Sequence, residues 1–303
     1  MAYIGSSIAP IASRVTSVNV SSSLTPPGGG SPVKPPAGTL VLAMMQGGTN
    51  VATLTPPSGW TAIPGCPQQV TGNVGTQGAW YRVFDGSEGA SFTFQSNQSD
   101  FQTVALLGFS GRNTSSPFTA TADTPQEFGA SPFVLVCNPV TAAAGDDVVI
   151  LGGNRFFNGT NAVSYAPPTG FGNANCVYAN VQYSPVAFWS IQQNVVPGSY
   201  GGAGGTITVP VDTNNQGSSA YVVALAQNTT AATYVSLAGA AFFGFEGAVE
   251  IVQATSYPAL GSFTFTGQNA SAAIGFSGGT GTLVGNPDFT VTLPYRWFTV
   301  VLE

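Results

Sequence analysis

The sequence predicts an all-β protein, with tandem β-sandwich units of the jelly-roll or immunoglobulin-like type. Glycine is abundant, at 39 of 303 residues, and turn signals recur about every ten residues. The apolar runs between these turns are short and rich in β-branched and aromatic residues. No stretch has the periodicity of a long helix, so the pattern is typical of sandwiches or barrels.

The same order of patterns occurs twice, which indicates an internal duplication of a β-unit. Loops change in length between copies more readily than strands do, so the spacing of the patterns drifts. The first copy comprises an apolar run at 40–45, a Pro-Pro-Ser-Gly-Trp turn at 56–60, an aromatic strand at 79–84, an alternating strand at 91–95 and an apolar run at 104–109. The second comprises 147–151, 167–171, 186–191, 206–209 and 221–226.

The N-terminal segment, residues 1–36, is predicted to be separate from these copies. A short apolar leader and an alternating stretch at 15–20 precede a Pro/Gly-rich linker at 25–32. This order predicts an anchoring arm, and a frayed terminus is the alternative. The candidate anchoring residues are Tyr3, Ile4, Ile8 and Ile11.

The rest of the chain divides into a first β-sandwich block at 37–117, a second at 118–228 and a C-terminal β-region at 229–303. The patterns leave open whether the two blocks are separate domains or one composite sandwich. In the C-terminal region, 261–268 alternates and 297–302 is a final apolar strand. We expect that strand to tie the C-terminus into a sheet.

The charge content is unusually low, since only 6% of the residues are Asp, Glu, Lys or Arg, against a usual value of about 25%. The surface must therefore consist of Ser, Thr, Asn, Gln and Gly. The net charge is −6, and five arginines and one lysine are scattered singly. We therefore expect no nucleic-acid partner and no attraction to anionic membranes. Residues 1–20 lack the features of a signal peptide, and no apolar run is long enough to predict membrane insertion.

The catalytic chemistry open to the chain is narrow. It contains no histidine, which excludes Ser-His-Asp and Cys-His catalysis and every His-ligated metal site. Paired carboxylates could still hydrolyse glycosides. The three pairs, which we interpret as solvated turn residues, are Asp85/Glu88, Asp146/Asp147 and Glu246/Glu250. We expect no enzyme activity and no cofactor.

The three cysteines, Cys66, Cys137 and Cys176, are far apart and odd in number. A disulfide framework is denser and usually even, so we interpret them as small apolar residues. One disulfide among them stays open. No Cys-x-x-Cys motif supports a zinc site.

Several aromatic residues lie near the long loops of the second block, where planar rings could stack on sugars. These candidate glycan contacts are Tyr165, Phe171, Tyr178, Tyr183 and Tyr200. A core or subunit-contact role is the alternative for each of them.

Three segments together resemble structural proteins of tailed bacteriophages. Residues 1–5, Met-Ala-Tyr-Ile-Gly, look like the leader of phage fibre proteins. The first copy of the duplicated pattern, from Gly38 to Gly111, is similar to a β-sandwich module of phage and bacterial surface proteins. That module often has a degenerate second half, here Asp147 to Ala226, and an acidic residue commonly follows its first glycine, where this chain has Thr39. Residues 261–268 look like a short repeat of phage tail-associated proteins.

This resemblance implies a non-enzymatic virion protein on the particle surface, as a tail fibre, tail tip, capsid fibre or capsid decoration. It would assemble in the host cytoplasm, bind other virion proteins through its arm, form a homo-oligomer and contact host surface glycans. The alternatives are a bacterial cell-surface carbohydrate-binding or adhesin module and, less favoured, a glycan-degrading enzyme.

Overall fold

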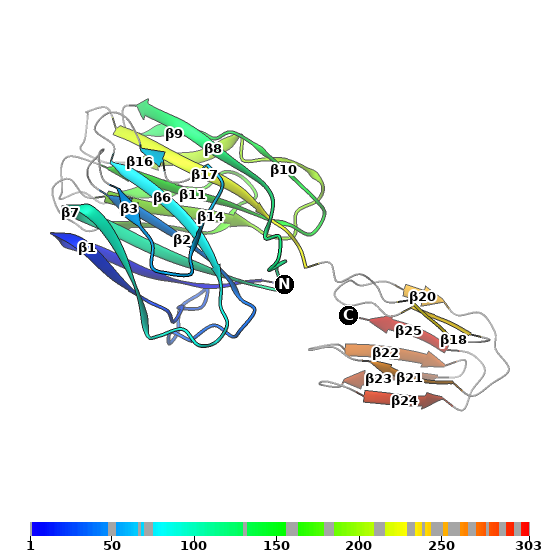
Figure 1. The fold of residues 1–303 in the computed structure, drawn as a ribbon. Coiled ribbons are helices and arrows are strands. Elements are labelled where there is room, and N and C mark those ends of the chain that lie inside the picture. Colours follow the sequence, from blue (N-terminus) through cyan, green and yellow to red (C-terminus); the bar gives the residue numbers. More distant parts are fainter. Residues whose placement is uncertain are drawn as a thin grey trace. The chain divides into compact units, whose positions relative to one another are not determined.

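The computed structural model describes residues 2–47, 53–65, 68–69, 75–129, 132–155, 163–178, 185–208 and 216–228, together with the strands of the C-terminal part (Figure 1). The chain divides into two compact units, Met1–Gln227 and Asn228–Glu303. Within the described residues every regular element is a β-strand, and every paired strand is antiparallel. The prediction of an all-β protein is therefore confirmed.

Two large sheets form the centre of the first unit. One sheet combines strands of the first block with the N-terminal segment, and the other comes from the second block. The sheet of the first block has the order β1-β7-β2-β6-β4, and the sheet of the second has the order β13-β14-β11-β17-β8. The first contains β1 (Ala2–Ser21), β2 (Leu40–Gly47), β3 (Leu54–Thr55), β4 (Thr61–Ala62), β5 (Gln68–Gln69), β6 (Thr76–Val83) and β7 (Ser91–Ser110). The second contains β8 (Phe118–Gly129), β11 (Asp147–Arg155), β13 (Gly172–Tyr178), β14 (Pro185–Gln192) and β17 (Gln216–Leu225).

Two smaller sheets accompany the second block. One has the order β12-β16-β9, and the other pairs β10 with β15. Their strands are β9 (Phe133–Val136), β10 (Val140–Ala142), β12 (Ser164–Ala166), β15 (Gly198–Tyr200) and β16 (Ala203–Thr208).

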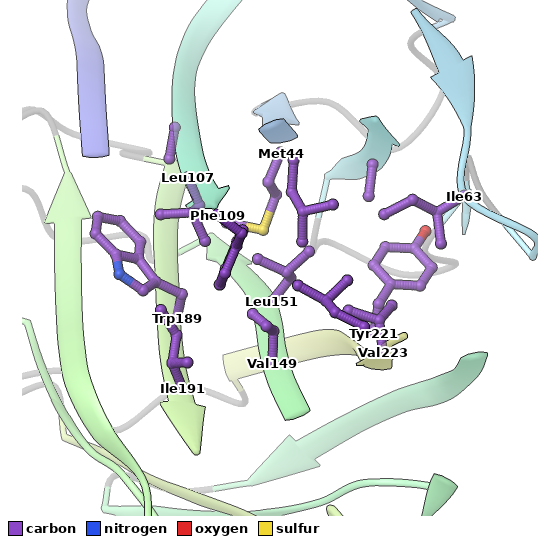
Figure 2. Close-up of a cluster of buried hydrophobic side chains, with 14 of the residues drawn as sticks. Met44, Ile63, Leu107, Phe109, Val149, Leu151, Trp189, Ile191, Tyr221 and Val223 are labelled. Atoms are coloured by element: carbon purple, nitrogen blue, oxygen red, sulfur yellow. The ribbon is translucent and has the colours of Figure 1, made fainter. Parts of the chain in front are cut away.

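The two blocks share one hydrophobic core. Leu42 and Met44 of β2 belong to the same buried cluster as Leu151 of β11, Trp189 of β14 and Val223 of β17. Figure 2 shows Met44 together with the three residues of the second block. The large sheets therefore face each other across this cluster. The sequence left open whether the two blocks are separate domains. The structure shows that their central residues are buried in one common cluster.

Each large sheet also buries its other face, which explains the continuous apolar runs. Successive side chains of a strand point to opposite faces. Along β2, Leu42 and Met44 enter the shared core, whereas Val41, Ala43 and Met45 enter a second cluster, which the first block forms together with the N-terminal segment. All eight residues of β2 are buried. A third cluster fills the space between the large sheet of the second block and its smaller sheets.

The N-terminal segment is part of the first sheet. β1 pairs with β7 from Ala2 opposite Ser110 to Ser21 opposite Ser91. Tyr3 enters the shared core, and its ring centroid lies 5.7 Å from that of Phe109. The sequence pattern predicted a separate arm, because local alternation does not reveal a partner strand about ninety residues away.

The predicted linker is also held against the first block. Leu24 and Val33 exchange backbone hydrogen bonds of 2.9 and 2.8 Å, so residues 24–33 form a loop that is closed at its base. Leu24 is buried, and the Nζ of Lys34 donates to the carbonyls of Gly86 and Glu88 at 2.9 and 2.6 Å. These contacts order a Pro/Gly-rich stretch that composition alone assigns to a flexible linker.

The second unit consists of short antiparallel strands. They form a four-stranded sheet, β20-β25-β22-β23, and two pairs, β18-β19 and β21-β24. The last strand pairs with both β20 and β22, so the C-terminal strand is tied into a sheet as expected. The bounds are β18 (Tyr234–Leu237), β19 (Ala240–Phe243), β20 (Ile251–Gln253), β21 (Gly261–Phe265), β22 (Ser271–Phe276), β23 (Gly279–Val284), β24 (Phe289–Leu293) and β25 (Phe298–Leu302).

Candidate functional site

The candidate glycan residues surround the hydrophobic cluster of the second block. Tyr165, Phe171, Tyr178 and Tyr200 are half-buried and pack against that cluster from different elements. Tyr183 lies outside the described residues. The structure therefore brings four of the five residues around one cluster.

The side chain of Tyr165 makes its contacts mainly within the hydrophobic core of the second block. Its ring centroid lies 4.6 Å from that of Phe188, and its hydroxyl donates to the carbonyl of Gly204 at 2.9 Å. The same hydroxyl is 2.9 Å from the Oγ of Ser190, which is fully buried. Burial raises the pKa of Tyr165 above its ordinary value. A hydroxyl with these partners is not free to bind a sugar.

Tyr200 also uses its hydroxyl within the protein, since the hydroxyl donates to the carbonyl of Val196 at 2.8 Å. Val196 itself is exposed. Phe171 and Tyr178 each leave part of the ring accessible, so these two residues and Tyr200 retain a surface on which a sugar ring could stack.

The sequence analysis did not predict an exposed polar face that β1 of the N-terminal segment forms with β7 and β3 of the first block. Outward side chains of β1, β7 and β3 alternate with residues of the buried cluster and come into register. The Oγ1 of Thr93 donates to the Oδ1 of Asn19 at 2.6 Å across two of these strands. The alternating patterns at 15–20 and 91–95 could have indicated two half-exposed strands. The sequence does not show that these two strands pair with each other. The exposed members are Ser17, Asn19, Ser21, Thr55, Ser91, Thr93 and Gln95.

The first acidic pair closes a turn. Glu88 accepts the backbone N–H groups of Asp85 and Gly86 at 2.7 and 3.0 Å, and Asp85 accepts the N–H and hydroxyl of Ser87 at 2.7 and 2.6 Å. The hydrogen bonds from Ser87 lower the pKa of the Asp85 carboxyl. Arg82 lies 3.7 Å from Glu88, which is buried, so only Asp85 matches the expected solvated residue.

The second acidic pair is buried, contrary to the prediction of solvated residues. Both oxygens of Asp146 accept backbone N–H groups, from Ala143 at 2.9 Å and Gln227 at 3.2 Å. Asp147 accepts the N–H of Asn194 at 2.9 Å, and its Oδ2 lies 2.9 Å from the Nη2 of Arg112. An arginine from the first block thus neutralises an aspartate of the second, a pairing that sequence spacing does not show.

The Arg112–Asp147 pair is fully desolvated, with both side chains at 0% exposure. Burial lowers the pKa of Arg112 and raises the pKa of Asp147, because water no longer stabilises either charge. Arg112 also donates to the carbonyls of Gly145 and Leu225 at 3.0 and 3.4 Å. The geometry is that of a structural clamp between the blocks. The third pair, Glu246 and Glu250, lies outside the described residues.

The candidate anchoring residues have unequal environments. Tyr3 is buried, and Ile4 and Ile11 pack against the cluster of the first block. Ile8 is 45% exposed on the edge strand β1. Ile8 is therefore the member of this set with a side chain available to a partner.

Neither of the cysteines in the described part of the chain forms a disulfide. Cys137 is buried, Cys176 is half-buried, and Cys66 lies outside the described residues. Burial raises the pKa of Cys176 to about 12, so its thiol stays protonated at neutral pH. Across the described residues, no group of three or more His, Cys, Asp or Glu side chains could hold a metal ion.

Among the described residues, no helix is long and apolar enough to cross a bilayer. No family model, no curated protein and no solved structure matches the chain.

Proposed function

We propose that the chain is a non-enzymatic structural protein of a tailed-bacteriophage virion, displayed on the particle surface. In this proposal residues 1–227 are a tandem β-sandwich of the jelly-roll or immunoglobulin-like type, and the chain assembles as a homo-oligomer with other virion proteins. The proposal rests on the phage-like sequence segments and on one structural observation: the buried members of its described acid pairs, Glu88, Asp146 and Asp147, all serve the fold.

That observation bears on the class of protein. Asp146 and Asp147 hold backbone N–H groups and an arginine, and Glu88 closes a turn that also binds Lys34. A glycosidase needs two carboxyl groups facing a sugar, one of them able to donate a proton. These carboxyl groups are committed to internal partners instead. The exposed polar face of β1, β7 and β3 is uncharged, which suits a surface that touches neutral hydroxyl groups.

We place the virion contact on the outer side of β1. A projecting arm would have to withdraw Tyr3 from the shared core and Leu24 from the cluster of the first block. The edge of β1 with the exposed Ile8 offers a contact that leaves both clusters intact. In this scheme the anchoring segment stays folded while it binds the particle.

We place glycan contact on the accessible rings of Phe171, Tyr178 and Tyr200. The hydroxyl of Tyr165 is excluded from this role by its internal hydrogen bonds. Titration of host polysaccharide against the variants Tyr178→Ala and Tyr165→Phe tests this assignment. The first variant should weaken binding and the second should not.

The direct test is mass spectrometry of purified particles. Trypsin yields few fragments, because the chain has only six Lys and Arg residues. Chymotrypsin suits its 34 aromatic residues (20 Phe, 10 Tyr and 4 Trp). Peptides at a constant ratio to a capsid or tail protein support the proposal, and their absence from particles rejects it.

The anchoring site is tested by Ile8→Asp, compared with Val33→Asp at another exposed apolar position, since Ile8 is 45% and Val33 is 60% exposed. Both variants should fold, because neither side chain is buried. Loss of incorporation by Ile8→Asp alone supports a contact on β1. Equal incorporation of both variants rejects that contact without rejecting a virion location.

A further inference from the structure

One buried carboxylate differs from the others in the described part of the chain. Glu88, Asp100, Asp146 and Asp147 are all buried. Each of the other three has both oxygens engaged by backbone N–H groups or by an arginine. Asp100 accepts only the N–H of its neighbour Phe101, at 2.8 Å, and its Oδ2 has no hydrogen-bond donor. A buried carboxylate oxygen without a donor or cation is costly, so it requires an explanation.

A second unpartnered acceptor lies two residues along the same strand. Gln102 is fully buried, and its Nε2 donates to the carbonyl of Val15 at 2.8 Å. Its Oε1 has no donor. Residues i and i+2 of a strand project from the same face and are about 7 Å apart. The two unpartnered oxygens therefore belong to residues that stand two positions apart on the same side of β7.

The ladder between β1 and β7 is interrupted at this position. Ile11 pairs with Gln102, Val15 with Asp100, and the next pair is Ser17 with Gln95. Residues 12–14 therefore oppose a single residue of β7, and residues 96–99 oppose a single residue of β1. Bulges of this kind leave backbone carbonyls outside the regular pairing. The carbonyl of Val15 already accepts the side-chain amide of Gln102, so further oxygen ligands would have to come from the other carbonyls of residues 12–16 and 96–99.

Arg14 does not neutralise Asp100. The guanidinium of Arg14 lies over the ring of Phe101, 5.6 Å from its centroid, and forms no ion pair with Asp100 within 4 Å in the described structure. The site thus combines a carboxyl oxygen and an amide oxygen that are both buried and both without a donor.

We propose that the bulge between β1 and β7 is a calcium site, in which Asp100 and Gln102 supply side-chain oxygens and the adjacent backbone supplies carbonyls. Ca²⁺ accepts six to eight oxygen ligands of mixed type in flexible geometry, whereas Mg²⁺ keeps most of its water and demands an octahedron. A single carboxylate gives low affinity, so the dissociation constant falls at about 10⁻⁴–10⁻³ M, as in extracellular modules. The ion would fasten the N-terminal strand to β7. This inference is independent of the proposed function.

The test is thermal unfolding of the full chain in CaCl2, in MgCl2 and in NaCl of equal ionic strength, with EDTA as reference. At ten times the dissociation constant, Ca²⁺ should raise the ratio of folded to unfolded protein about 11-fold. For a unit of this size the midpoint should rise by about 3–6 °C. An equal shift in all three salts, or no shift in CaCl2, overturns the proposal, the latter because a buried water then suffices for Asp100.

Variants assign the effect to the site. Asp100→Asn should abolish the calcium shift and should be more stable than the parent in EDTA, because it removes the uncompensated charge. The matched control Asp85→Asn changes an exposed aspartate and should keep the full shift. Gln102→Glu adds a second carboxylate and should bind Ca²⁺ several-fold more tightly while losing stability in EDTA. A calcium shift that survives Asp100→Asn overturns the proposal.

Discussion

Removal of Arg112 should destabilise the first unit more than removal of any other described arginine. In Arg112→Met, the carboxylate of Asp147 stays at 0% exposure with one remaining hydrogen bond, from Asn194. The carbonyls of Gly145 and Leu225 lose their donor as well. Breaking a buried ion pair by deleting one partner costs about 3–5 kcal/mol. For a unit of 227 residues this lowers the midpoint of thermal unfolding by about 6–20 °C.

The matched control is Arg82→Met. Arg82 is 20% exposed and lies 3.7 and 3.9 Å from its acidic partners, so its loss should cost less than about 1 kcal/mol. Glu88 keeps both of its backbone donors in this variant. Urea unfolding of the full chain, followed by tryptophan fluorescence, gives the two free energies of unfolding.

A double variant separates the ion pair from side-chain packing. Asp147→Asn retains an oxygen for the N–H of Asn194 but carries no charge. Combined with Arg112→Met, it should recover about 2 kcal/mol or more of the single-variant loss, because no uncompensated charge stays buried. If Arg112→Met costs no more than Arg82→Met, or if the double variant is simply the sum of the singles, the clamp does not exist as described.

Other substitutions should follow from the same contacts. Tyr165→Phe should cost about 1–3 kcal/mol in urea unfolding, because a buried serine and a carbonyl lose their partner, whereas Tyr200→Phe should cost less than about 1 kcal/mol; equal costs would contradict the core role of Tyr165. Gly152→Ala should cost about 1–3 kcal/mol, because its new Cβ overlaps the ring of the cross-strand neighbour, while Gly172→Ala meets open space; a neutral Gly152→Ala would contradict the packing. The pKa of Cys176 in the folded protein, about 12, exceeds the value in the unfolded chain. The contribution of the protonated thiol to the free energy of unfolding is therefore complete below about pH 8.5 and is lost as the pH rises toward 12. Free energies of unfolding measured between pH 8 and pH 11 should therefore fall, less steeply in Cys176→Ala, and an unchanged slope in that variant would refute the assignment.

The sequence predicted strand content well where burial is continuous. The runs at 40–45 and 104–109 appear as β2 and as the C-terminal half of β7. Such runs are typical of strands that are covered on both faces. Here the side chains on one face of the strand pack in the shared core, and those on the other face pack in the second cluster. The periodicity does not say which partner covers a face, so the shared core could not be derived from it.

Contacts between segments far apart in the chain were the features that the sequence predicted least well. The pairing of Ala2 with Ser110 and the ion pair of Arg112 with Asp147 join segments that have no common local pattern. Tyr165 shows a related limit, since an aromatic ring with a hydroxyl suits a sugar site and a core equally. Its bond to the carbonyl of Gly204 decides between the two. The unpaired oxygen of Asp100 is likewise a product of irregular register rather than of a motif.

The shared core is tested most directly by native-state hydrogen exchange in the variant Leu151→Ala. Leu151 of β11 is buried among residues of both blocks, and truncation of such a side chain costs about 2–5 kcal/mol. If the blocks form one cooperative core, the amides of β2 in the first block should lose as much protection as those of β17 in the second. Loss of protection confined to the second block would contradict a common core.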